Sequence, residues 1–206
     1  MTQIRSIHHP EAINQACAIL SDGGLVVVPT DTVYGVACNP FDEAAIERLF
    51  IAKQRPPDKA IPVLLADLAA AEAVATYIPE QAKQLAERFW PGPLTLTLPK
   101  RPNLPPNLSA FPTVGVRVPD HDGCRALLRA AGGALAVTSA NRSGGENPTD
   151  VEDARKQLGD HVALYLDDGP SPRALASTVV ALDGSGFRIL REGPISAAEI
   201  AAVLHS

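Results

Sequence analysis

Aromatic residues are scarce in this sequence: they make up 4% of its 206 residues, against 46% hydrophobic and 20% charged residues. Long apolar runs are missing too, and the opening stretch MTQIRSIHHPEAINQ lacks the apolar core of a signal peptide. This composition excludes a membrane-spanning helix and a disordered chain. We therefore expect a globular protein in the cytoplasm.

Cysteine is equally sparse, because the chain has three cysteines, Cys17, Cys38 and Cys124, far apart and without metal-ligand spacing. Their odd number and wide spacing argue against a disulfide framework and against a zinc site. The formal net charge of -5 excludes general attraction to nucleic acid or anionic lipid, since both need a basic surface. A bound anion would have to be held by a local cluster of cations.

Apolar residues alternate between helical and strand periods, which predicts a mixed α/β fold. The length suits a single domain over residues 1–206. We expect helices at 11–21, 43–53, 80–89, 122–131, 150–158 and 197–204. We expect strands at 25–28, 61–66, 94–98, 114–118, 135–138, 162–165, 177–182 and 187–190, with a proline-rich surface loop over 99–112.

Three local patterns refine these boundaries. Thr149 and Ser196 are each followed three residues later by a glutamate, Glu152 and Glu199, which predicts a capping box at the start of each of the last two helices. The sequence DGSG between the last two strands is typical of a tight turn, so these strands are expected to form a hairpin.

The stretch PTDTVYG follows an apolar strand and places Thr30, Thr32 and Tyr34 at every second position. In an extended chain, alternate side chains share a face, so the three hydroxyls are expected to point the same way. Pro29 and Gly35 bracket them where loops commonly present ligand groups. The alternative is a half-exposed strand in which threonine is simply a good β-former.

Lys53, Arg55 and Lys59 crowd within seven residues of this acidic protein. Pro56 biases Arg55 away from the helical region, so Lys53 and Arg55 are expected to project together beyond a helix end. Guanidinium and ammonium groups are the usual partners of phosphate oxygens. The alternative is a solvated helix C-terminus, where basic residues meet the dipole favourably.

The segment LAVTSANRSGGENPT ends an apolar strand with Ser139 and Asn141 and continues into a pair of glycines. Glycines let a ligand approach the backbone closely, while the hydroxyl and amide supply hydrogen-bonding partners. The segment matches neither a Walker P-loop nor a dinucleotide fingerprint, and an ordinary polar strand-to-helix loop remains the alternative.

Arg117 alternates with valines in TVGVRVPDHD, so it faces away from them, either toward a cleft or toward water. Its fork suits recognition of a carboxylate. Arg191 in ILREG has the same character at the end of another strand, and His121 between two aspartates is a candidate base or a surface histidine in a turn.

The order of these motifs along the chain resembles the YrdC/Sua5 family of L-threonylcarbamoyladenylate synthases. The matching stretches are PTDTVYGVACNPFD, LFIAKQRPPDKAIPVLL, WPGPLTLTL, VGVRVPDH, TSANRSGGENPT, STVV and ILREG, which span about residues 11–195. The resemblance implies a twisted mixed sheet with helices around a large basic concave cavity. It also implies the condensation of L-threonine, bicarbonate or CO2, and ATP into threonylcarbamoyl-AMP and pyrophosphate, with Mg2+ accompanying the ATP.

The resemblance further implies a role for each matching residue on the nucleotide side of the cavity. The basic residues Lys53, Arg55 and Lys59 would hold the ATP phosphates, and the first two would also neutralise charge in the transition state. No covalent catalytic residue is implied. The other expected nucleotide contacts are Thr113, Ser139, Asn141, Asn147 and Arg191, of which Asn147 stands where many members have serine.

On the amino-acid side, the resemblance implies that Thr32 contacts L-threonine, that Arg117 binds its carboxylate and that Ser177 helps to place it. A TsaD/Kae1-type transferase would then move the threonylcarbamoyl group to adenosine 37 of tRNA, with which this chain could make transient contact. The chain resembles the single-domain form, without the C-terminal domain that Sua5-type members append.

Two other functions remain open at this point. One is a non-catalytic module that binds double-stranded RNA or tRNA, against which the acidic net charge and the few aromatic residues count. The other is a carbamoyl-adenylate-forming domain that uses a different acceptor.

Overall fold

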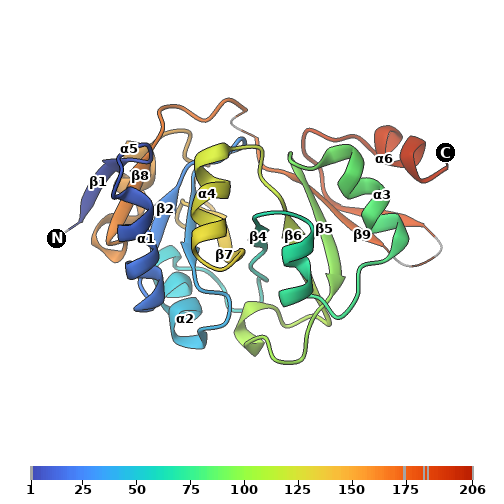
Figure 1. The fold of residues 1–206 in the computed structure, drawn as a ribbon, viewed down its shortest axis with the longest axis horizontal. Helices are drawn as coiled ribbons and strands as arrows, with labels where there is room; N and C mark the ends of the chain where they lie inside the picture. The colour runs from blue at the N-terminus through green and yellow to red at the C-terminus, as the bar shows by residue number, and fades with distance from the viewer. Residues whose placement is uncertain (1, 174, 183, 185, 206) are drawn as a thin grey trace.

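The computed structural model describes residues 2–173, 175–182, 184 and 186–205. Within these ranges, the strands form one ten-stranded sheet in the order β1-β8-β2-β3-β7-β4-β6-β5-β9-β10. Figure 1 shows this sheet as a long twisted ribbon, with the N-terminus at one end of the molecule and the C-terminus at the other. The predicted mixed α/β fold is confirmed.

The sheet mixes parallel and antiparallel pairs, for example β1 with β8 in parallel and β3 with β7 in antiparallel orientation. The strands are β1 Gln3–Ser6, β2 Val26–Val28, β3 Gly35–Cys38, β4 Val63–Leu65, β5 Leu94–Pro99, β6 Thr113–Arg117, β7 Ala134–Ser139, β8 Leu164–Asp167, β9 Thr178–Leu182 and β10 Phe187–Arg191.

Six α-helices lie within the described ranges, close to the predicted positions. They are α1 Ala12–Ser21, α2 Glu43–Lys53, α3 Glu80–Phe89, α4 Asp122–Ala130, α5 Val151–Leu158 and α6 Ala197–Leu204. Short 3-10 turns at Ala69–Ala73, Pro106–Leu108 and Gly159–His161 were not predicted, because three to five residues carry no readable helical period.

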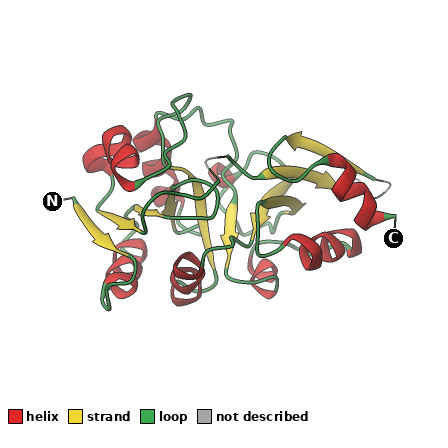
Figure 2. Cartoon of the chain, turned by 90° about the horizontal axis from the view of Figure 1, so that it is seen from above, coloured by secondary structure: helices red, strands yellow, loops and turns green. Residues whose placement is uncertain are grey.

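The helices cover both faces of the sheet, as the view from above in Figure 2 shows. Strand β2 explains the division, since its alternate residues point to opposite sides. Val26 and Val28 pack with α1 and α4, whereas Val27 packs on the other side with residues of α2 and α5. Both faces of the central strands are therefore buried, and these strands read as continuous apolar runs.

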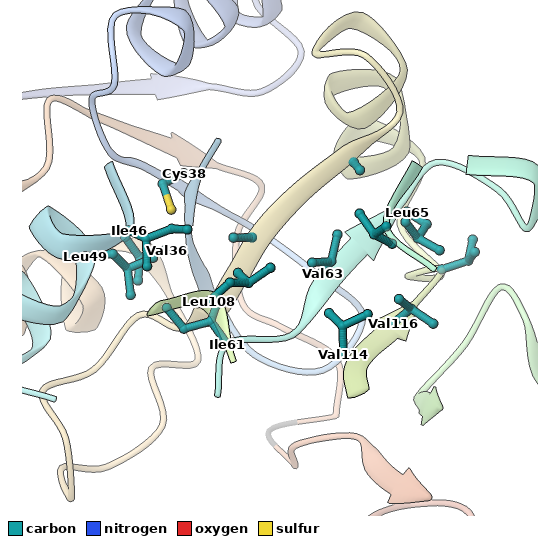
Figure 3. Close-up of a cluster of buried hydrophobic side chains, with 14 of the residues drawn as sticks. Val36, Cys38, Ile46, Leu49, Ile61, Val63, Leu65, Leu108, Val114 and Val116 are labelled. Carbon is teal, nitrogen blue, oxygen red and sulfur yellow. The ribbon is translucent and has the colours of Figure 1, made fainter. Parts of the chain in front are cut away.

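Figure 3 shows part of the larger core, in which Ile46 and Leu49 of α2 lie against Val36 of β3 and against Ile61 and Leu108. Ile46 and Leu49 are fully buried. Truncation of a leucine at such a site costs about 2–5 kcal/mol of stability. This packing fixes the position of α2, which ends in the candidate site.

Two strands were not predicted from the sequence. Strand β3 was expected to be a continuation of β2, but it turns back and pairs antiparallel with it. Strand β1 is short, polar and exposed at the sheet edge, so it lacks the apolar alternation that identifies a strand.

One of the two predicted capping boxes is wrong. The helix expected to begin at Thr149 is capped by Asp150, whose carboxylate accepts a hydrogen bond from the Asp153 amide at 2.8 Å. A carboxylate is the better cap because it also meets the positive end of the helix dipole. The predicted box of Ser196 and Glu199 is confirmed in both directions.

The predicted hairpin is confirmed by the antiparallel pairing of β9 with β10. The DGSG turn itself includes Asp183 and Ser185, which lie outside the described residues. Among the helices of the described ranges, none combines the length and the apolar character that crossing a bilayer requires.

Candidate functional site

The motif that joins β2 to β3 is a bent loop and not an extended segment. The hydroxyls of Thr30 and Thr32 still lie 3.0 Å apart, so the expectation that the three hydroxyls point the same way holds for these two and is wrong for Tyr34. The Thr30 hydroxyl accepts hydrogen bonds from the amides of Thr32 at 3.2 Å and Val33 at 3.3 Å, and lies 2.7 Å from the Val33 carbonyl. These side-chain bonds turn the chain. The Tyr34 hydroxyl points elsewhere, because it donates to the Gly169 carbonyl at 2.6 Å.

Arg117, at the end of β6, is 5% exposed, and its side chain binds this loop. Its Nε donates to the Gly92 carbonyl at 2.8 Å, its Nη1 to the Thr32 hydroxyl at 2.9 Å and its Nη2 to the Asp31 carboxylate. Of its two expected directions, the one toward water is therefore wrong. The predicted proximity of Thr32 and Arg117 is confirmed by their hydrogen bond.

Burial lowers the pKa of Arg117, while the Asp31 carboxylate raises it. Arginine has five N–H donors, and the three contacts of Arg117 occupy three of them, which leaves two. Two donors on one guanidinium match the two oxygens of a carboxylate.

Ser177 lies just before β9 and joins the site to the far end of the sheet. Its hydroxyl is 2.8 Å from that of Thr95 and accepts a hydrogen bond from Arg191 Nη2 at 3.0 Å. Arg191 Nε donates to the Ser177 carbonyl at 3.0 Å. Ser177 is 4% exposed, so it is fixed by its neighbours.

Lys53, the last residue of α2, is 1% exposed and reaches the loop after β7. Its Nζ donates to the carbonyls of Ser139 and Asn141 and lies 3.4 Å from Asn141 Oδ1. The Ser139 hydroxyl donates to the same Oδ1, and Asn141 Nδ2 donates to the Gly145 carbonyl at 2.7 Å. The structure therefore brings Lys53 together with Ser139 and Asn141.

Lys53 and Arg55 do not project together, contrary to the sequence expectation. The residue after helix α2 is Gln54, which takes a left-handed conformation with φ of 50° and redirects the chain. Arg55 then donates to the carbonyls of Lys59 at 3.3 Å and Ala60 at 2.9 Å and remains partly exposed.

Four cations of the site are electrostatic neighbours that connect the end of α2 to β10 and β6. They are Lys53, Arg55, Arg191 and Arg117. Burial is the main cause that lowers the pKa of each, and it lowers that of Lys53 to about 7. The second cause is a neighbouring cation: Arg55 for Lys53, Arg191 for Arg55, and Arg117 for Arg191. We call these four residues the cation row.

Mutual repulsion in the cation row is unfavourable, and an anion bound among the four side chains would relieve it. This local concentration of positive charge occurs in a chain whose net charge is -5. The row is therefore a candidate anion-binding site at the junction of α2, β6 and β10.

The remaining predicted residues have no side-chain hydrogen bond to the cation row within the described residues, although the Lys59 carbonyl accepts from Arg55 Nε at 3.3 Å. Lys59 and Asn147 are exposed. Thr113 begins β6, at the opposite end from Arg117, and four residues of strand correspond to about 13 Å. Within the described residues, no hydrogen bond connects the Thr113 side chain to the other site residues.

Asp31 is the main contributor that the sequence analysis missed. Its carboxylate is 4% exposed, accepts from Arg117 and accepts from the Asp120 amide at 3.1 Å. Asp31 stands between Thr30 and Thr32, in the motif that the sequence analysis considered only for its hydroxyls. This position was the available signal, because a buried arginine requires an anionic partner.

His121 is neither free in a turn nor placed as a base. Its Nδ1 accepts from the Cys124 amide at 3.2 Å and caps α4, while its Nε2 lies 3.1 Å from Asp168 Oδ2. Of the three cysteines, Cys38 and Cys124 are buried, whereas Cys17 is partly exposed.

The geometry defines a class of protein. It is an α/β domain whose central strands and adjacent loops present a row of cations, and one of these cations is a buried arginine with two remaining donors. Comparison with known proteins identifies the family. The Sua5/YciO/YrdC family model, described as "Telomere recombination", matches residues 18–193. The chain belongs to this family.

Individual relatives agree with this assignment. A Mycobacterium tuberculosis protein is 43% identical over 209 residues, which cover 99% of this chain and 96% of that protein. The threonylcarbamoyl-AMP synthase of Bacillus subtilis is 38% identical over 206 residues, covering 99% of this chain and 59% of its own.

A solved structure gives the same result for the fold. Pyrococcus abyssi Sua5 complexed with L-threonine matches with a TM-score of 0.94 at 35% identity, and the match covers 98% of this chain and 61% of that one.

Proposed function

We propose that this chain is an L-threonylcarbamoyladenylate synthase. In this reaction the amine of L-threonine adds to CO2 or bicarbonate to give a carbamate. A carbamate oxygen then attacks the α-phosphorus of ATP, and pyrophosphate leaves as threonylcarbamoyl-AMP forms. The proposal rests on family membership, on relatives that carry this name and on a solved relative that binds L-threonine.

The observation that carries the proposal is the cation row. Arg55 follows α2 and Arg191 ends β10, yet each lies near enough to lower the pKa of a neighbour: Arg55 that of Lys53, and Arg191 that of Arg55. A triphosphate is the common ligand with enough negative charge to balance such a row, and Arg55 and Arg191 keep the guanidinium geometry that suits phosphate oxygens.

The amino-acid side lies at one end of this row, at Arg117. Its two remaining donors fit the carboxylate of L-threonine, with the Thr32 hydroxyl beside them and Ser177 joined through Arg191. Because Arg191 and Arg117 interact, the carboxylate and the phosphates would be bound side by side. This proximity is what joining the two substrates needs.

Residues with these roles position substrates and neutralise charge, and the proposed reaction needs no covalent nucleophile. The side chains on the nucleotide side are cations and neutral donors, which fit phosphate oxygens and not a metal ion. We therefore assign Mg2+ to the phosphates of the incoming ATP, where it would shield their charge. Lys59, Thr113 and Asn147 remain proposed nucleotide contacts, as does the large basic cavity.

The labile product requires a consumer. We propose a TsaD/Kae1-type transferase that passes the threonylcarbamoyl group to adenosine 37 of tRNA, in the cytoplasm. Any contact of this chain with tRNA would be transient, because the acidic net charge gives little general attraction for RNA.

Purified protein with ATP, Mg2+, bicarbonate and L-threonine should release pyrophosphate and form an adenylate that mass spectrometry detects. Arg55→Ala should lower kcat/KM by about 100-fold or more, as removal of one preorganised donor does. Arg129→Ala, at an exposed arginine of α4, is the control and should keep full activity.

Three results would contradict the proposal, and each has a distinct meaning. Pyrophosphate release that does not need L-threonine would indicate a different acceptor. Salt-sensitive RNA binding without pyrophosphate release would indicate a binding module. Full activity of Arg55→Ala would move the phosphate site away from the cation row.

A further inference from the structure

Lys53 has an unusual position for a residue expected to touch phosphate. It is 1% exposed, and its ammonium group lies against three oxygens of the loop after β7: the carbonyls of Ser139 and Asn141, and Asn141 Oδ1. An ammonium group has three N–H donors. The three oxygens therefore account for its full donor capacity.

The backbone of Lys53 binds the same loop. Its carbonyl accepts a hydrogen bond from the Ser143 amide at 2.8 Å, so side chain and main chain together connect the end of α2 to residues 139–143. Helix C-termini favour a cation, which adds to the attraction between the ammonium group and these carbonyl dipoles. Arg55, in contrast, bonds within its own segment and remains partly exposed.

The loop that Lys53 holds carries the proposed nucleotide contacts. Asn141 is 6% exposed, accepts from the Ser139 hydroxyl and donates to the Gly145 carbonyl, so its orientation depends on the path of the backbone around it. Without the ammonium group, the Ser139 and Asn141 carbonyls would lose their partner in a buried place. Such a loss favours rearrangement of the loop toward water.

We propose that Lys53 is a positioning residue that fixes the Ser139–Asn141 segment for the nucleotide, and that it acts through this segment and not by contact with a phosphate group. This inference rests on the proposed function, whose nucleotide it concerns. It gives a physical reason why Lys53 and Arg55 occur together with Ser139 and Asn141. The lysine organises the segment of Ser139 and Asn141, and the arginine faces the ligand.

The first test uses the ligand-free protein, so it is independent of catalysis. Hydrogen exchange measured by mass spectrometry should show that Lys53→Met accelerates exchange about tenfold or more in peptides that cover residues 139–145. Peptides from β5 and α4 should be unchanged. Arg55→Met is the matched control, because it removes a neighbouring cation that does not contact this loop, and its exchange should equal that of the unmodified protein.

The second test measures ATP binding by titration of ATP in single and double variants. If Lys53 acts through Asn141, the losses caused by Lys53→Met and Asn141→Ala should be far less than additive, whereas Lys53→Met with Arg55→Met should be additive within about twofold. Unchanged exchange at residues 139–145 together with additive losses for Lys53 and Asn141 would overturn the inference. Absence of pyrophosphate release from the unmodified protein would instead overturn the proposed function and leave the exchange result valid.

Discussion

Replacement of Arg117 by methionine would leave the Asp31 carboxylate buried without its cation. The two side chains are 6% and 4% exposed, so little solvent reaches the carboxylate that loses its partner. Asp31 Oδ1 would keep the Asp120 amide at 3.1 Å, whereas Oδ2 has no hydrogen-bond partner within the described residues even when the arginine is present. The variant therefore measures the free energy of an uncompensated buried charge.

The expected loss follows from the size of this effect in other proteins. Removal of one partner of a buried ion pair costs about 3–5 kcal/mol of unfolding free energy. For a protein of this length, each kcal/mol lowers Tm by about 2–4 °C, so the expected change is a fall of about 6–20 °C. Arg117→Met with Asp31→Asn should recover more than half of the loss, because the charge is gone and the amide oxygen still accepts from Asp120.

Urea-induced unfolding gives the required free energies. The single tryptophan, Trp90, is a suitable probe, since it lies two residues from Gly92, whose carbonyl accepts from Arg117. Arg117→Lys keeps the charge without the fork and serves as a control. A loss below about 1 kcal/mol for Arg117→Met, or a double variant no more stable than the single one, would refute the reasoning. The stable double variant should still lack activity with L-threonine.

Three further outcomes are expected. Tyr34→Phe should destabilise the protein by about 1–3 kcal/mol and speed hydrogen exchange at residues 168–171, because the hydroxyl bonds that segment. In the folded protein, iodoacetamide should modify Cys17 before Cys124, which is buried and whose thiol pKa burial raises to about 12; equal rates would contradict this. Ser196→Ala should lower thermal stability by about 0.5–2 kcal/mol, measured by calorimetry, since it removes the cap that Glu199 completes.

The sequence predicted those elements whose signal is local and repeated. The bounds of α2, α3 and α6 agree with the structure because each has a long apolar period and clear flanking residues. Strand β3 could not be separated from β2, because a chain reversal made by the Thr30 hydroxyl resembles a continued strand when only residue types are read. Contacts between distant segments determine which strands lie next to each other, and the local sequence does not record these contacts.

The candidate site shows the same limit at the level of single side chains. Residue types and the family resemblance identified Lys53, Arg55, Arg117 and Arg191, and the structure places them as electrostatic neighbours. Their directions were not predictable, since the left-handed Gln54 that separates Lys53 from Arg55 has no strong sequence signature. Such a conformation costs about 1–3 kcal/mol for one residue and changes what the next side chain can reach.

Burial assigns different tasks to cations that the sequence treats alike. Lys53 is enclosed by carbonyl oxygens, and Arg117 is neutralised by Asp31, so both have partners inside the protein. Arg55 is partly exposed, and its hydrogen bonds go to backbone carbonyls, which satisfy donors without cancelling charge. Asp58 offsets part of the charge of Arg55. An incoming triphosphate can reach Arg55 most directly, because it is the least buried of these three side chains. The enclosed lysine and the paired arginine instead hold the loops that shape the site around it.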